Sequence, residues 1–309
     1  MSQALRSLLD LLDVEQIEQD MFRGRSRPPV SRHDPVGRRS APPESLAAPR
    51  VFGGLVAAQA LVAAGRTVPA DRHVHSLHAY FLRPGDPGVP IVYSVDRIRD
   101  GLSFVTRRVD AIQHGQPVFQ LSASFQRYEE GLDHQAPMPA APDPEMLPTS
   151  GERLRGYAHL DARIVEAHRQ TREAVDLRYV DEPPYGRYGA PRESHSQVWF
   201  RTDGKLDGDT DDEPLLHVAL ATYISDMTLL DPVLLAHGRG GWAVGDVVGA
   251  SLDHAMWFHR PFRVDEWLLY AQESPSAYGG RGLGQARIYT RDGRLAVSVI
   301  QEGVVRVPR

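Results

Sequence analysis

The feature that most constrains the fold of this chain is a repeated stretch. The run "LHAYFLRP" begins at Leu77, and the run "DHAMWFHRP", which begins at Asp253, repeats its order of aromatic, arginine and proline residues. An offset of 177 positions relates Phe81 to Phe258, Arg83 to Arg260 and Pro84 to Pro261, and an offset of 178 relates Gly115 to Gly293. A nearly constant offset over so long a stretch predicts an internal duplication, in which both copies share one architecture.

Each copy begins with a helix that has no polar face. The runs "GGLVAAQALVAAGRTV" from Gly53 and "LLHVALATYISDMTLL" at 215–230 are apolar on almost every side, which is typical of a buried helix. Strand-like runs separated by turn residues follow each helix, at 73–82, 90–100, 103–113 and 117–126, and again at 247–262, 266–278, 283–293 and 294–307. The pattern predicts an α+β fold in which an antiparallel sheet wraps a helix in each copy.

Two stretches without apolar periodicity divide the chain. Residues 129–150 are rich in proline, so we expect an N-terminal repeat at 1–135, a linker at 136–150 and a C-terminal repeat at 151–309. In the first repeat, an N-terminal helix and a strand at 14–24 precede an insert at 25–50 that is rich in Pro, Arg and Ser. We interpret the insert as a loop, whose arginines are either solvated or contact an anionic ligand.

Composition excludes several classes of function. The 35 basic and 40 acidic residues give a net charge of −5, which offers no electrostatic basis for binding nucleic acid or an anionic membrane. The absence of cysteine excludes disulfides and a cysteine nucleophile. The apolar run at 55–65 is too short to span a bilayer, and Asp10 and Asp13 interrupt the start that a signal peptide needs. We therefore expect a cytoplasmic protein without stable membrane insertion.

Three polar residues of the second copy depart from the first. By the repeat offsets, Ser251 corresponds to Val74 and Gln301 to Ala123. Asp226 falls late in the second helix, where the first helix is rich in alanine. If one copy keeps the scaffold and the other carries the chemistry, these departures mark the candidate site.

Each departure also has a structural interpretation. Asp226 can be a surface or capping acid, although an acid near a helix C-terminus is disfavoured by about 0.3–1 kcal/mol. Gln301 shares one face of its strand with Leu295, Val297 and Val299, where a core amide needs a hydrogen bond. Ser251 alone is a weak signal, because serine is common in strands. A local rule broken without visible compensation favours the functional interpretation of Asp226.

Metal binding finds little support in the sequence. His73, His75 and His78 lie close together, but no carboxylate stands at a convincing spacing from them. The acidic loop at 203–213 does not have the ligand spacing of a calcium loop. We therefore expect neither a metal nor another cofactor.

The chain resembles the acyl-CoA thioesterase II family, a bacterial enzyme with a double hotdog fold. The resemblance is carried by "MSQALRSLLDLLDVEQIEQDMFRG", "VFGGLVAAQAL", "HSLHAYFLRPGD", "RDGLSFVTRRVDAIQHGQPVF", "SASFQ", "YISDM", "DHAMWFHRPF", "EWLLY" and "VIQEGVVR". It covers nearly everything except the insert at 25–50 and parts of 137–215. It implies two tandem hotdog repeats, which pair into one continuous sheet, and a homo-oligomer of such double hotdogs.

The resemblance also implies an activity and a site. The family hydrolyses fatty acyl-CoA, of medium to long chain and in a broad range, to free fatty acid and CoA without a metal, which belongs to fatty acid metabolism. Its Asp–Thr/Ser–Gln constellation falls on Asp226, Ser251 and Gln301, with serine where relatives often carry threonine. A helix N-terminus suits the developing oxyanion, and Gly53-Gly54 is one candidate. Attack by Asp226 itself is a rival mechanism. A non-catalytic acyl-CoA-binding or dehydratase-like hotdog protein is the alternative function.

Overall fold

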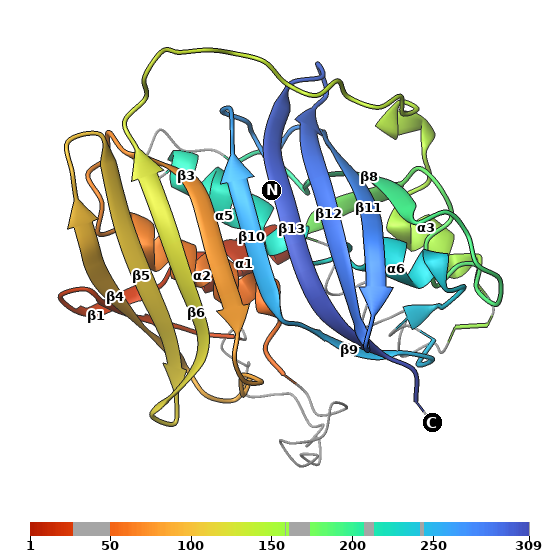
Figure 1. The fold of residues 1–309 in the computed structure, drawn as a ribbon, viewed down its shortest axis with the longest axis horizontal. Coiled ribbons are helices and arrows are strands. Elements are labelled where there is room, and N and C mark those ends of the chain that lie inside the picture. The colour runs from red at the N-terminus through yellow and green to blue at the C-terminus, as the bar shows by residue number, and fades with distance from the viewer. Residues whose placement is uncertain (27–49, 158, 161–173, 207–212, 242–243, 309) are drawn as a thin grey trace. The chain divides into compact units, whose positions relative to one another are not determined.

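The chain forms two compact units, each built on an antiparallel sheet (Figure 1). The structure is a computed structural model and describes residues 1–26, 50–157, 159–160, 174–206, 213–241 and 244–308. Unit 1 comprises Met1–Arg6, Glu130–Asp209 and Met227–Arg309, and unit 2 comprises Ser7–Glu129 and Thr210–Asp226. Most of the insert at 25–50, and part of the acidic loop at 203–213, lie outside the described residues.

Unit 2 wraps its sheet around a helix that is buried on all sides. The strand order is β1-β2-β4-β5-β6-β3, and every neighbouring pair is antiparallel. Helix α2 (Gly53–Gly65) lies against β4, β5 and β6, and helix α5 (Glu213–Ser225) packs on α2. Residues 54–64 of α2 are all buried, as its lack of a polar face predicts. The strands are β1 (Glu15–Glu18), β2 (Met21–Gly24), β3 (His73–Phe81), β4 (Ile91–Asp100), β5 (Phe104–Gln113) and β6 (Gln116–Gln126).

Unit 1 contains a second set of antiparallel strands of the same kind. Its order is β10-β13-β12-β11-β8-β7, and β9 also pairs with β13. The short helix α6 (Asp231–Ala236) lies on β8, β11 and β12, and α3 (Ser150–Arg155) lies on β7. The strands are β7 (Val175–Tyr179), β8 (His195–Thr202), β9 (Val248–Ser251), β10 (Asp253–Phe258), β11 (Leu268–Tyr278), β12 (Arg281–Thr290) and β13 (Leu295–Arg306). Helix α1 (Gln3–Leu12), whose residues from Ser7 onward belong to unit 2, buries Leu5, Leu8 and Leu12.

The strand orders of the two units confirm the duplication. The order β2-β4-β5-β6-β3 in unit 2 recurs as β8-β11-β12-β13-β10 in unit 1. Strands β5 (Phe104–Gln113) and β12 (Arg281–Thr290) are 177 positions apart at both ends. The turn glycines that follow them both have positive φ, 71° at Gly115 and 87° at Gly293, a backbone conformation that favours glycine. The expected α+β class with one wrapped sheet per copy is therefore confirmed.

Three expected elements are divided differently in the structure. The helix expected at 215–230 ends at Ser225, turns follow, and Pro232 near the start of α6 opens a new helix. The strand expected at 14–24 is a hairpin of β1 and β2, with Asp20 at φ 57°, which aspartate tolerates in turns. The strand expected at 247–262 breaks at Leu252 into β9 and β10.

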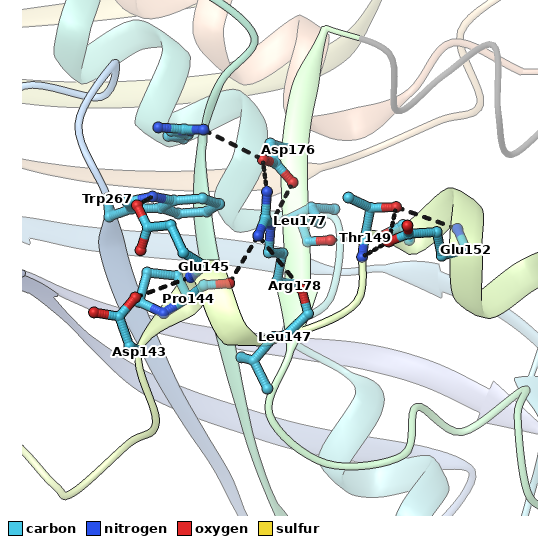
Figure 2. A network of polar contacts seen from close by, with 12 residues as sticks. Asp143, Pro144, Glu145, Leu147, Thr149, Glu152, Asp176, Leu177, Arg178 and Trp267 are labelled. Carbon is cyan, nitrogen blue, oxygen red and sulfur yellow. Dashed lines mark hydrogen bonds and ion pairs between the residues drawn. The ribbon is translucent and has the colours of Figure 1, made fainter.

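The segment expected to be a linker is packed onto unit 1. Met138, Ala141 and Leu147 lie against a buried cluster of Trp199, Trp267, Leu269, Tyr289 and Leu295. The indole N–H groups of Trp199 and Trp267 donate to Pro142 O and Glu145 Oε1, both at 2.9 Å. In Figure 2, Arg178 bonds both Asp176 and the carbonyl of Pro144, beside the Trp267 ring. Aperiodic composition therefore coexists here with specific long-range packing.

None of the helices in the described ranges is long and apolar enough to cross a lipid bilayer.

Candidate active site

Ser251, His254 and Gln301 form a chain of hydrogen bonds in unit 1. Gln301 Nε2 donates to Ser251 Oγ at 2.7 Å, and Gln301 Oε1 lies 2.6 Å from His254 Nδ1. This contact is a hydrogen bond in the tautomer of His254 that carries its proton at Nδ1, because an amide oxygen only accepts. Gln301 and His254 are each only 1% exposed, whereas Ser251 is partly exposed. Ser251 is therefore the more exposed end of a buried chain of polar side chains.

A β-bulge brings these side chains together. Strand β9 pairs with β13 through Gly303↔Ser251, whereas β10 pairs with it through Ala255↔Ile300, so the register shifts by one residue between them. In a regular strand, residues three apart point to opposite faces of the sheet, and Ser251 and His254 would not share a partner. The bulge turns both toward Gln301, and re-aiming a side chain in this way is common beside active sites.

Asp253 compensates for the irregular pairing at the bulge. Its Oδ1 accepts the Glu302 N–H at 2.7 Å, while the Leu252 N–H donates to Glu302 O at 2.9 Å. The backbone groups beside the bulge thus keep partners, as groups near a buried site require. The bulge is a supported feature of the fold.

The first copy has the same bulge without the polar chain. Between β3 and β6 the register shifts between Val74 and Ser76, at the place that corresponds to Ser251 and Asp253. The three positions of the polar chain correspond there to Val74, Leu77 and Ala123, all buried and apolar. Gln301 shares its buried face with Val297 and Val299, as expected. Leu295 was expected on the same face, but the register between β12 and β13 shifts so that Leu295 pairs with Tyr289, and Leu295 packs with the cluster on the opposite face.

Comparison of the two repeats in the sequence identifies Ser251 and Gln301 as polar departures, but it does not single out His254, to which Gln301 is hydrogen-bonded. Subtracting 177 from 254 gives Leu77, which is 0% exposed, so His254 is a further polar departure at an apolar core position. The difference between His254 and Leu77 is visible in the same alignment of the two copies. It is easily overlooked because His254 lies inside the repeated motif that defines the offset.

Asp226 lies in unit 2, at the junction of two helix ends. It follows Ser225, the last residue of α5, and is partly buried. A Cβ atom on Gly53, the first residue of α2, would lie 2.8 Å from Asp226 Oδ2 and 2.8 Å from the Phe81 ring. Glycine at 53 therefore allows the carboxylate to approach the start of α2. The ring of Tyr223 packs edge-on against Phe52 with centroids 5.1 Å apart.

This position changes the electrostatic interpretation of Asp226. The C-terminus of α5 disfavours its charge, as the sequence predicts, but the positive N-terminal end of α2 favours it, each by about 0.3–1 kcal/mol. The N-terminus of α2 therefore offsets the unfavourable effect of the α5 C-terminus on the Asp226 charge, which the sequence alone does not show. Burial, with a smaller contribution from the Asp226 charge, raises the pKa of Tyr223 to about 12, so that phenol stays neutral beside the carboxylate.

Of the three predicted site residues, the structure brings Ser251 and Gln301 together in unit 1 and places Asp226 in unit 2. One of the histidines considered as metal ligands has another contact: His75 Nε2 lies 2.8 Å from Ser124 Oγ. Among the described residues, no three His, Asp or Glu side chains are grouped so that they could hold a metal ion.

The fold is shared with solved structures that cover the whole chain. A hotdog-fold protein from Alicyclobacillus acidocaldarius matches with a TM-score of 0.71 at 18% identity over 100% of both chains. An acyl-CoA thioesterase II from Mycobacterium marinum matches with a TM-score of 0.74 at 42% identity, over 97% of this chain and 98% of that one. With two repeats of one antiparallel strand order and these structural neighbours, the chain is a double-hotdog protein.

Sequence comparisons define the family. The family model described as acyl-CoA thioesterase matches residues 169–304, and the model of the acyl-CoA thioesterase N-terminal domain matches residues 41–126. Acyl-CoA thioesterase 2 of Haemophilus influenzae is 38% identical over 99% of both chains, and acyl-coenzyme A thioesterase 8 of mouse is 40% identical over 98% of this chain and 90% of its own. The chain belongs to the acyl-CoA thioesterase family, and its activity class is acyl-CoA thioester hydrolysis.

Proposed function

We propose that this protein hydrolyses fatty acyl-CoA, of medium to long chain and in a broad range, to free fatty acid and CoA. In the proposed reaction a water attacks the thioester carbonyl, the C–S bond breaks, and CoA leaves as a thiolate that takes up a proton. Asp226, Ser251 and Gln301 hold and activate that water. The observation that carries the proposal is the hydrogen bond from the buried Gln301 amide to the hydroxyl of the partly exposed Ser251, in a member of the acyl-CoA thioesterase family.

The Gln301–Ser251 pair acts by positioning. The amide N–H donates to Ser251 Oγ, so the oxygen of Ser251 accepts in that bond and its hydroxyl hydrogen is directed away from the amide. Gln301 is held in the core of the sheet, where its side chain has little freedom to move. A donor and acceptor fixed before the substrate arrives need no reorganisation during the reaction.

Asp226 supplies the base. A carboxylate accepts the proton that the water loses as it attacks, and this transfer is typically worth 10²–10⁴-fold in rate. The close approach of Asp226 to Gly53 puts the base beside the N-terminus of α2. The unpaired N–H groups at a helix N-terminus suit the developing oxyanion, so the Gly53-Gly54 start of α2 is the proposed oxyanion donor.

The cellular setting follows from the same proposal. We infer a cytoplasmic enzyme of fatty acid metabolism that acts as a homo-oligomer of double hotdogs. The residues of edge strand β1 are all exposed, and an exposed edge is a surface on which copies can associate. Light scattering coupled to gel filtration measures the assembly, and a monomer would contradict this part of the proposal.

The test is release of free thiol from acyl-CoA. Purified protein is assayed with a series of straight-chain acyl-CoA from short to long, and Gln301→Ala, which installs the residue of the first copy (Ala123), is assayed beside it. We expect hydrolysis by the wild-type protein and loss of kcat in Gln301→Ala. Tight acyl-CoA binding without thiol release would identify a binding protein instead.

Two rivals are separated by further products. Direct attack by Asp226 forms an anhydride. If water then attacks the aspartyl carbonyl of that anhydride, a single turnover in ¹⁸O-labelled water places the label in the Asp226 carboxylate and leaves the fatty acid unlabelled, whereas direct attack of water on the thioester labels only the fatty acid. The buried His254 gives a dehydratase-like reaction one specific support, because such chemistry uses a histidine base. Hydration of an enoyl-CoA without thiol release would establish that reaction, whereas its absence supports the thioesterase.

A further inference from the structure

We propose that Gln59 is a positioning residue of the hydrolysis: its buried side-chain amide fixes helix α2 along its axis, so that the N-terminus of the helix stays against Asp226. The inference rests on the proposed function, because the Gly53-Gly54 start of α2 is the proposed oxyanion donor. It adds a residue in the middle of α2 that the hydrolytic roles above do not use.

The amide of Gln59 joins α2 to three other parts of unit 2. Its Nε2 donates to the carbonyl of Leu11 in the last turn of α1 and, at 2.8 Å, to the carbonyl of Arg25, the residue after β2. Its Oε1 accepts the hydroxyl hydrogen of Tyr93 on β4 at 2.6 Å. Both amide hydrogens and the amide oxygen therefore have partners, and these come from different elements of the fold.

The partners of Gln59 allow only one orientation of its amide. A backbone carbonyl oxygen only accepts, so the two carbonyls require the NH2 group opposite them. Burial raises the pKa of the Tyr93 hydroxyl well above its usual value, so the phenol keeps the proton that it donates to Oε1. Gln59 and Tyr93 are both 0% exposed, and loss of one bond would leave a buried polar group unpaired. The amide is therefore a specific connection between α2 and its surroundings.

The composition of α2 explains why such a connection is needed. Gln59 is the only polar side chain in the helix, whose sequence is GGLVAAQALVAAG. Apolar contacts are not directional, so small apolar side chains alone define the axial position of a helix weakly. A buried polar side chain with fixed partners sets the register, which is the best-attested use of such residues between packed helices. Arg66, the C-cap residue, adds a second polar contact with the carbonyl of Val14.

The N-terminus of α2 depends on these contacts for its position. The residue before it is Phe52, whose side chain has no oxygen that could cap the first N–H groups. A Cβ atom on Gly54 would lie 2.5 Å from Tyr223 O, just as one on Gly53 would lie 2.8 Å from Asp226 Oδ2. Glycine permits these approaches but contributes no side-chain bond that holds them. Because one helical residue corresponds to about 1.5 Å along the axis, even a partial shift of α2 would move the oxyanion donor relative to the base.

The first test is Gln59→Leu, which removes all three hydrogen bonds and keeps a side chain of similar size. We expect kcat to fall by roughly tenfold to 10²-fold, because a displacement of about 1 Å at the reacting groups has an effect of that size. KM should change less, since the oxyanion develops only in the transition state. The three former partners lose a bond in the core, so Tm should fall as well.

A matched control lowers the stability of the same helix without removing its polar contacts. Leu61 lies two residues further along α2 and is 0% exposed. Leu61→Ala leaves a cavity in the core, so we expect a lower Tm with kcat per folded molecule near the wild-type value. Thermal melts and saturation kinetics of both variants separate lost stability from lost position. Equal falls in kcat in Gln59→Leu and Leu61→Ala would leave Gln59 a structural role only and overturn the proposal.

A milder pair of variants decides the case in which Gln59→Leu does not fold. Tyr93→Phe removes one of the three bonds, and we expect kcat to fall severalfold. Its control is Tyr289→Phe in unit 1, because Tyr289 is 1% exposed and its hydroxyl donates to Pro137 O at 3.1 Å. We expect the control to keep the wild-type kcat. If Gln59→Leu is unfolded and Tyr93→Phe turns over at the rate of Tyr289→Phe, the proposal is overturned.

The same assays distinguish failure of this inference from failure of the proposed function. If Gln301→Ala loses activity while folded Gln59→Leu keeps the wild-type kcat, the positioning role fails and the proposed function stands. If Gln301→Ala keeps the wild-type rate, the proposed function fails and this inference fails with it. A fall in kcat in Gln59→Leu, with wild-type kcat in Leu61→Ala, is the result that the positioning role predicts.

Discussion

Replacing Asp226 by asparagine removes the charge that accepts the proton and keeps the shape of the side chain. If Asp226 is the base, kcat should fall by roughly 10²–10⁴-fold, the usual contribution of a positioned acid or base. Acyl-CoA binding should change little, because the loss falls on the transition state. Thiol release under saturating substrate gives kcat, and equilibrium binding of a non-hydrolysable acyl-CoA ether gives the affinity.

The same variant makes a prediction for stability. The asparagine loses an unfavourable interaction with the C-terminus of α5 and a favourable one with the N-terminus of α2, each of about 0.3–1 kcal/mol. Because the two have opposite signs, the net change should stay below about 1 kcal/mol, or roughly 2 °C or less in Tm for a chain of 309 residues. A structural role for Asp226 predicts a clear drop in Tm with normal turnover per folded molecule.

Asp231, an acid close to Asp226 in the sequence, provides the control. Asp231 lies in the first turn of α6 and accepts the Tyr179 hydroxyl at 2.7 Å. Asp231→Asn loses a favourable helix-end charge and weakens that bond, so its Tm should fall while kcat per folded molecule stays near wild type. If Asp226→Asn behaves in the same way as Asp231→Asn, the assignment of Asp226 as base is refuted.

Three further perturbations test other parts of the account. Gly53→Ala places a Cβ 2.8 Å from Asp226 Oδ2, so kcat should fall by tenfold or more while the gain in helix propensity, of about 0.5–1 kcal/mol, limits any loss of Tm; an unchanged kcat would contradict the close approach. Cutting the chain at Pro142 should give no independently stable halves, because α5 follows the cut in the sequence and packs on α2, which precedes it. A cooperative melt of either isolated half would refute this. Burial of Asp265 raises the pKa of its carboxyl, but bonds from Arg263 and Leu206 N–H outweigh burial and lower that pKa below 3.8. Its ionised form therefore stabilises the fold above pH 3.8, and this contribution disappears as the pH falls through the lowered pKa. Asp265→Asn should lower Tm at pH 7, with a smaller difference from wild type in acid, and a difference that is constant with pH would contradict the linkage.

The repeat made much of the fold predictable from the sequence. An offset of 177 aligned β5 with β12 at both ends, and the lack of a polar face identified α2 and α5 as buried. These features are local or periodic, so each is visible in one stretch of chain. The breaks within expected elements were less visible, because Ser225 and Leu252 differ little in helix or strand propensity from their neighbours.

The long-range contacts could not be predicted in the same way. The proline-rich segment at 136–150 has the composition of a linker, yet Trp199 and Trp267 bind its backbone and side chains. The approach of Asp226 to Gly53 likewise depends on where two distant helices end. Neither contact follows from spacing in the sequence.

The candidate site was predictable as far as the copies could be compared. Ser251 and Gln301 were identified as polar departures, and the structure joins them by a hydrogen bond of 2.7 Å. The bulge that turns Ser251 and His254 to one side was not predictable, because strict alternation along a strand places them on opposite faces.

The central claim is that Asp226 and Gln301 act on one water during hydrolysis of acyl-CoA. The most direct test is a double-mutant cycle of kcat/KM for thiol release, with Asp226→Asn, Gln301→Ala and the combined variant. Groups that serve one step are strongly non-additive, so the account predicts that the combined variant is little slower than the slower single variant. If instead the two effects multiply in full, or if either single variant keeps the wild-type kcat/KM, the account is contradicted.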